Sequence, residues 1–155
     1  MKRKWNVVVL LLSLLCASQA LAQNGDIAVV VNSANRASGI SMAELRKLFA
    51  GEKQTWPGGQ TVKLFVRAPG TPERNALMKL LNMTESEYKK YWAAQVFKGE
   101  AQAEPLMLPS NGIQKEAVHA FPGALVLMAT ADVKTGLKVL KVNGLLPGEA
   151  GYPLH

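Results

Sequence analysis

The sequence has almost no cysteine: Cys16 is the single residue of this type among 155 residues. It lies beside an apolar N-terminal run that we expect to be removed by cleavage after Ala22. The remaining chain then has no thiol, which excludes disulfides, cysteine nucleophiles and thiolate metal sites together. The fold must therefore be stabilised by its hydrophobic core.

The N-terminus also lacks an apolar run long enough to cross a bilayer. Residues 2–4 are basic, residues 7–15 are apolar, and residues 20–22 give the small-x-small cleavage site typical of a secretory signal peptide. The apolar run has about half of the roughly 20 residues that a spanning helix needs. A bacterial lipidation site has a small residue directly before its cysteine, whereas Leu15 precedes Cys16. We therefore expect residues 1–22 to be a cleaved signal peptide, residues 23–155 to form a single periplasmic domain, and no stable membrane insertion.

The sequence lacks a dense basic block. The whole chain has 18 basic and 11 acidic residues, a formal net charge of +7. Without Lys2, Arg3 and Lys4, 15 basic and 11 acidic residues remain, a net charge of +4. The lysines are scattered and are not interleaved with aromatic residues, so we expect no nucleic acid partner; a small anion fits this mild positive charge better.

Catalytic motifs are missing as well. The sequence contains no HExxH, no nucleophile elbow and no P-loop. Of the two histidines, His119 falls within a predicted helix and His155 ends what we expect to be a loose tail. We therefore expect no enzyme, no cofactor and no metal site. A small hydrolase remains an alternative only if a site forms from residues distant in sequence.

Strands and helices alternate along the chain. The run at residues 27–31 is continuously apolar, as in a strand that is covered on both faces. Capping signals at Ser41, Thr71 and Thr84, and at Ser110 or Asn111, predict helix starts. The order predicts an α/β fold with a single helix-flanked, mostly parallel sheet. Strands are predicted at residues 27–31, 62–66, 106–108, 124–128 and, at a sheet edge, 137–142; helices are predicted at residues 42–50, 71–81, 84–97 and 110–121.

The most informative segment is residues 62–81, in which a predicted strand runs into Arg67, turns, and opens a helix. Thr71 is a good N-cap, and Pro72 suits the first helical position because its missing N–H would be unpaired there. Gly70 lets the backbone approach a ligand closely. Free amides and the positive end of the helix dipole would then lie beside the Arg67 guanidinium, so the segment is a candidate anion cradle.

Several segments resemble the substrate-binding proteins of phosphate ABC transporters. The helix from Met42 to Gly51 and the following Trp56 resemble a helix and turn of that family. Arg67 with Gly70-Thr71 resembles the family's anion-binding turn, and residues 122–125 (Pro-Gly-Ala-Leu) resemble a strand entry. The anion-binding turn differs from the family's in that Pro72 and Glu73 follow Thr71.

This resemblance implies a fold like one lobe of a periplasmic binding protein and a role in transport as a phosphate binder. The second lobe has no counterpart here. The implied contacts lie at three turns that would all follow the C-terminal ends of parallel strands. They are Arg67, Gly70 and Thr71; Asn32 and Ser33; and Ser110, Asn111 and Gly112.

One lobe alone provides little binding energy. Helix-terminus contacts contribute roughly 0.3 to 2 kcal/mol and a charge-assisted hydrogen bond about 1.5 to 3, whereas millimolar binding needs about 4 kcal/mol and micromolar about 8. Strong capture therefore requires a transporter, a sensor protein or a homodimer that completes the site. The alternative is an interaction or assembly protein of the envelope that keeps the fold without a ligand. Guanidinium and amide groups suit phosphate, sulfate and organic phosphates equally.

Overall fold

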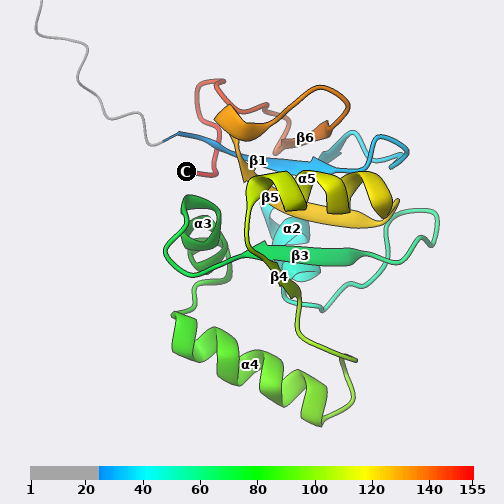
Figure 1. Cartoon of the computed structure of the whole chain (residues 1–155), viewed down its shortest axis with the longest axis vertical. Helices are drawn as coiled ribbons and strands as arrows, with labels where there is room; N and C mark the ends of the chain where they lie inside the picture. Colours follow the sequence, from blue (N-terminus) through cyan, green and yellow to red (C-terminus); the bar gives the residue numbers. More distant parts are fainter. Residues whose placement is uncertain (1–24) are drawn as a thin grey trace, which may run out of the picture.

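The structure, a computed structural model, describes residues 25–155 and is built around one six-stranded sheet (Figure 1). The predicted signal peptide, with Cys16 and the cleavage site after Ala22, lies outside the described residues. No helix within residues 25–155 is long and apolar enough to cross a membrane.

Five of the six strands run in the same direction. The order across the sheet is β2 (Gly39–Ile40), β6 (Lys138–Val142), β1 (Ile27–Val31), β5 (Ala124–Ala129), β3 (Lys63–Arg67) and β4 (Leu106–Leu108). The neighbours β2 and β6, β5 and β3, and β3 and β4 are parallel, while β1 runs antiparallel to both β5 and β6. The predicted α/β class with a mostly parallel sheet is confirmed.

Two predictions about the strands are wrong. The first strand, β1, is the antiparallel member, and its continuous burial gave no sign of this because burial on both faces does not encode direction. The last strand, β6, is not an edge strand, because the two-residue strand β2 pairs with it on its outer side. A strand of two residues is too short to leave a periodic pattern in the sequence.

Helices cover both faces of the sheet. Figure 1 shows α5 (Asn111–Ala120) in front of the sheet and α2 (Met42–Phe49) behind it. Alternate residues of β1 face opposite sides of the sheet. Val29 and Val31 pack in the core shared with α2 and α3 (Pro72–Leu81). Ala28 and Val30 pack in the core under α5. The strand is buried along its whole length, as predicted.

The predicted helix starts are confirmed by their caps. Ser41, Thr71, Thr84 and Ser110 each accept a hydrogen bond from the backbone N–H three residues later, at α2, α3, α4 (Glu85–Phe97) and α5. Ser110 rather than Asn111 therefore caps α5. Such caps depend only on a short stretch of chain, which is why the sequence predicts them well.

The helix α4 lies farthest from the sheet, at the bottom of Figure 1. Its buried side chains are Tyr88 and Trp92, and Tyr91 donates a hydrogen bond to the carbonyl of Ala50 over 2.6 Å. A side chain on Gly51 would lie 2.8 Å from the Trp92 ring, so a glycine is required where α4 meets the end of α2. These aromatic residues therefore pack α4 against the rest of the fold.

The C-terminal segment is docked, contrary to the expected loose tail. The Tyr152 hydroxyl donates to the carbonyl of Ile27 over 2.8 Å, and the N–H of Ile27 donates to the carbonyl of Leu154 over 3.0 Å. His155 Nδ1 lies 3.0 Å from Asp26 Oδ1. Tyr152 and Leu154 are both buried, so alternate residues of this segment extend the core beside the start of β1.

Candidate functional site

Two of the three predicted binding turns lie next to each other. Val66 and Arg67 of β3 pair with Met107 and Leu108 of β4 in parallel register. The turns that follow, residues 68–71 and 109–110, therefore leave the sheet at the same end. We call this end, where β3, β4 and β5 finish, the carboxyl rim; the opposite end is the amino rim. The helices α3 and α5 both begin at the carboxyl rim.

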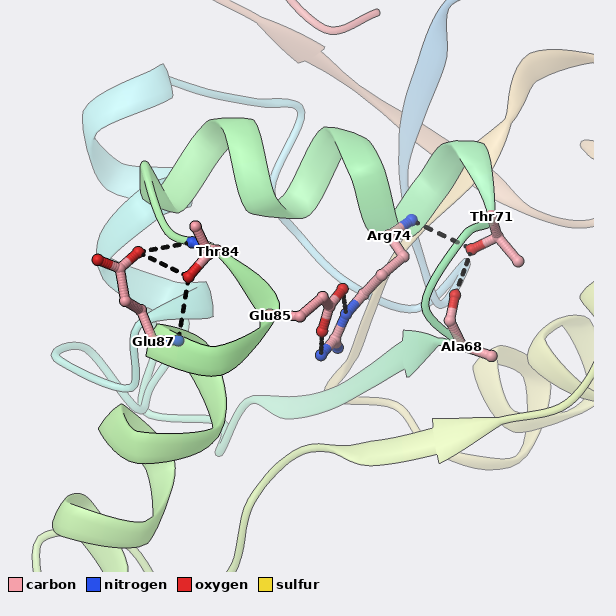
Figure 2. Close-up of polar contacts among 6 residues, drawn as sticks. All are labelled: Ala68, Thr71, Arg74, Thr84, Glu85 and Glu87. Atoms are coloured by element: carbon pink, nitrogen blue, oxygen red, sulfur yellow. Dashed lines mark hydrogen bonds and ion pairs between the residues drawn. The ribbon is translucent and has the colours of Figure 1, made fainter.

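The Thr71 hydroxyl is occupied by hydrogen bonds to the backbone of its own turn and helix. It donates to the carbonyl of Ala68 over 2.9 Å and accepts from the N–H of Arg74 over 3.3 Å (Figure 2). Gly70 adopts a φ of +89°, a conformation that favours glycine, and places the turn tightly before the helix. Since Pro72 has no N–H and the N–H of Arg74 is taken, the N–H of Glu73 is the donor left in the first turn of α3 among the described residues.

The second turn is arranged in the same way. The Ser110 hydroxyl accepts from the N–H of Ile113 over 3.2 Å. Asn111 Nδ2 donates to Asp132 Oδ2 over 2.5 Å, while Asn111 Oδ1 is buried without a hydrogen-bond partner. Gly112 is exposed in the first turn of α5. The negative charge of the Asp132 carboxylate therefore already lies near the positive end of the α5 helix dipole.

Arg67 is half-buried, and part of its guanidinium faces inward. Its side chain lines a cavity of about 10 Å³ together with Glu73 and Gln114. Its Nε and Nη1 atoms are buried and have no hydrogen-bond partner. A cavity of this size holds about one water molecule and no oxyanion.

Asn32 and Ser33 lie at the amino rim, away from the other predicted site residues. Since β1 is antiparallel to β5, with Val31 opposite Leu125 at the beginning of β5, the end of β1 is at the far side of the sheet from Arg67. Asn32 Nδ2 donates to the carbonyls of Val118 and His119 at the end of α5, over 2.7 and 3.2 Å. The expectation that all three turns lie at one end of the sheet is therefore wrong.

The sequence alone did not reveal the polar groups under the carboxyl rim. Glu73 is 3% exposed and accepts from the N–H of Ala129 over 3.2 Å. Gln114 is fully buried; its Nε2 donates to the carbonyl of Leu127 over 3.1 Å and its Oε1 has no partner. Within α5, Gln114 lies one turn before the buried Val118, a spacing that marks a core position even for a polar residue.

An ion pair beneath α3 holds the two successive helices together. Arg74 is 5% exposed and donates to both oxygens of Glu85, over 2.8 and 2.7 Å (Figure 2). Its guanidinium also stacks on the Tyr88 ring at 4.1 Å. Burial raises the pKa of Tyr88 to about 12. Arg74 is therefore fixed as a structural residue and is not available to a ligand.

The carboxyl rim can offer an anion two helix N-termini and one guanidinium, but each is accompanied by an acidic group. Glu73 lies in the first turn of α3 and lines the same cavity as Arg67, and Asp132 contacts Asn111 in the first turn of α5. Within residues 25–155, no group of three or more His, Cys, Asp or Glu side chains is arranged to hold a metal ion. The site is suited to a small polar ligand held by amides and one arginine, with modest net attraction for anions.

This fold is similar to about half of several solved proteins whose names describe phosphate receptors or phosphate-binding proteins. The chain matches an ABC-type phosphate transport receptor from Vibrio cholerae with a TM-score of 0.64 and 19% identity, over 79% of this chain and 48% of the receptor. It matches a putative phosphate ABC transporter substrate-binding protein with bound phosphate from Clostridium perfringens with a TM-score of 0.64 and 14% identity, over 79% and 47% of the two chains.

A possible phosphate binding protein from Planctomyces limnophilus is similar as well, with a TM-score of 0.58 and 18% identity over 81% of this chain and 46% of that one. The chain thus spans about half the length of the solved proteins it matches. No protein-family model matches the sequence. The resemblance noted from the sequence is confirmed at the level of the fold, and the match to half of each chain agrees with a single lobe.

Proposed function

We propose that this protein is an exported oxyanion-binding module, with phosphate as its leading ligand, that presents one half of a binding site at the carboxyl rim. The observation that carries this proposal is the register of β3 with β4, which brings Arg67 and the N-termini of α3 and α5 to one end of the sheet. Helix N-termini beside a guanidinium form a natural anion site. The proposal includes no catalytic step.

Weak binding by the isolated protein follows from the same geometry. The Thr71 and Ser110 hydroxyls are occupied as caps, and Glu73 and Asp132 oppose an incoming anion. One charge-assisted hydrogen bond and one helix terminus give about 2 to 5 kcal/mol, which corresponds to millimolar affinity. Tight capture would need a second surface facing the carboxyl rim, from a transporter, a sensor or a second copy of the chain.

Titration followed by NMR tests this function at the affinity expected. The protein, purified from the periplasm after export, should show saturable amide shifts at Gly70, Glu73 and Gly112 with phosphate in the millimolar range, and similar shifts with sulfate. Arg67→Ala should abolish them. The matched control is Arg36→Ala, because Arg36 is an exposed arginine that follows β1 at the amino rim.

Two results would contradict the proposal. One is the absence of saturable shifts up to tens of millimolar phosphate. The other is an equal loss in the Arg67→Ala and Arg36→Ala variants, since this would mean that phosphate responds only to the overall positive charge. The mass of the same periplasmic sample tests the proposed cleavage site, because cleavage after Ala22 leaves Gln23 as the first residue.

A second candidate function is protein interaction without a ligand. It is favoured by apolar residues at the β4 side of the sheet: Leu106 and Met107 are 59% and 55% exposed, and Ile113 on α5 is 47% exposed. The absence of anion binding together with stable association through this surface would support it. Substitution of Met107 by glutamate should then abolish the association, because it places a charge in the contact.

A further inference from the structure

The cavity under the carboxyl rim is lined by a buried acid, Glu73, and a half-buried base, Arg67. Arg67 reaches it from the end of β3, Glu73 from the first turn of α3, and Gln114 from α5 on the other face of the sheet. Its remaining walls are apolar: Phe49, Phe65, Val66, Leu77 and Leu127. The space of about 10 Å³ is too small for an oxyanion.

The polar atoms on its walls are incompletely paired. Arg67 Nε and Nη1 and Gln114 Oε1 are buried and have no hydrogen-bond partner, while Glu73, 3% exposed, is held by the N–H of Ala129. Buried charges in proteins are normally paired with an opposite charge. Arg67 and Glu73 are the two ionisable residues that line this cavity, so each is the counter-charge available to the other.

We propose that Glu73 is the internal counter-ion of Arg67 and competes with an external oxyanion for it. This inference rests on the proposed function of the carboxyl rim. The N–H of Ala129 holds the Glu73 carboxylate at the wall of the cavity that Arg67 also lines. The two side chains form no direct ion pair, but the negative charge stays near the guanidinium when a ligand arrives. An oxyanion must turn Arg67 outward or share it, and it is repelled by the buried carboxylate in either case.

Glu73→Gln tests the competition directly. Glutamine keeps the shape and an oxygen that can accept from the N–H of Ala129, but it removes the negative charge. Phosphate should bind the variant at least tenfold more tightly than the unmodified protein in the NMR titration. The matched control is Glu52→Gln, which removes an exposed carboxylate before β3 at the amino rim and should change the affinity less than twofold.

A double-mutant cycle measures the Arg67–Glu73 interaction without any ligand. Arg67→Gln in the unmodified protein leaves the Glu73 charge buried and unpaired, whereas in the Glu73→Gln background it does not. Urea unfolding measures the factor by which Arg67→Gln lowers the folding equilibrium constant. This factor should be at least tenfold larger in the unmodified protein than in the Glu73→Gln background. Should Glu73→Gln fold poorly, Glu73→Asp withdraws the carboxylate by one methylene group and should give a smaller gain in affinity.

The outcomes separate this inference from the proposed function. Loss of binding in Arg67→Ala supports the site regardless of Glu73. If Arg67→Ala loses phosphate binding but Glu73→Gln binds phosphate no more tightly than the unmodified protein, the counter-ion role of Glu73 is overturned. The proposed anion site at the carboxyl rim is still supported in that case. Additive effects in the unfolding cycle would also overturn the counter-ion role. If phosphate binds Glu73→Gln but not the unmodified protein, the competition by Glu73 is supported, while phosphate binding as the function of the unmodified protein is contradicted.

Discussion

Removal of the Arg74 charge should destabilise the protein through the contact between α3 and α4. Arg74→Met keeps the length of the side chain but loses both hydrogen bonds to Glu85 and the stacking on Tyr88. Breaking a fully buried ion pair costs about 3 to 5 kcal/mol. Because the Glu85 side chain is 36% exposed and can be rehydrated, we expect a smaller loss, about 2 to 3 kcal/mol.

Urea unfolding followed by tryptophan fluorescence measures this loss, since Trp92 packs beside Tyr88 with ring centroids 6.3 Å apart. Glu85→Gln alone should cost about 1 kcal/mol, and the double variant should lose less than the sum of the two single variants. A cost of Arg74→Met below about 0.5 kcal/mol, or strict additivity, would refute the view that this ion pair joins the two helices.

The same pair gives the stability a defined pH dependence. The hydrogen bond from Arg74 holds the pKa of Glu85 below its ordinary value of 4.5, against the opposing effect of burial. Because the pKa of Glu85 is lower in the folded state, the pair contributes its full stability when the pH is above the pKa of Glu85 in the unfolded chain. This contribution is lost as the pH falls through the pKa of Glu85 in the folded protein. The fall in unfolding free energy as the pH is lowered between these two pKa values should therefore be smaller in Arg74→Met than in the unmodified protein.

Two further changes should be equally informative. Gly123→Ala should prevent cooperative folding or lower the unfolding free energy by more than about 3 kcal/mol, because a Cβ at this position would lie 2.0 Å from the carbonyl oxygen of Thr61. Circular dichroism and thermal melting measure this effect. A near-native melting temperature would contradict the close approach. Tyr152→Phe should lower the unfolding free energy by about 1 kcal/mol because the carbonyl of Ile27 loses its buried donor, and unchanged urea unfolding would show that the tail contributes nothing through this bond.

The sequence predicted the local features of the fold well. The helix starts at Thr71, Thr84 and Ser110 each depend on a side chain and an amide three residues apart, so a short window of sequence contains the whole interaction. The strand at residues 27–31 was likewise evident, because its uninterrupted apolar run requires burial on both faces. These elements are enough to define the α/β class.

Strand direction was not predictable from the same information. Parallel and antiparallel central strands have similar apolar runs, so the sequence does not reveal that β1 is antiparallel or that Asn32 lies at the amino rim. The two-residue strand β2 is a strand only through its pairing with β6. Both features arise from contacts between residues about one hundred positions apart, which no local pattern records.

The candidate site was predicted in part for the same reason. The adjacency of the Arg67 and Ser110 turns follows from parallel strands, and the structure brings these turns together. The partial burial of the Arg67 guanidinium and the role we propose for Glu73 depend on how β3, α3 and α5 meet around one small cavity. A sequence motif names the residues at a turn, but it does not say whether a side chain faces the ligand or the core.

The antiparallel direction of β1 brings both ends of the described chain to the carboxyl rim. Ile27 pairs with Ala129 at the end of β5, and Asp26 contacts His155 over 3.0 Å, so a short linker could join residue 25 to residue 155. New ends could then be opened in the exposed turn at Gly58 and Gly59, before β3 at the amino rim. Such a circular permutant would keep every strand of the sheet while moving tags, fusions and surface attachments to the side opposite the candidate site.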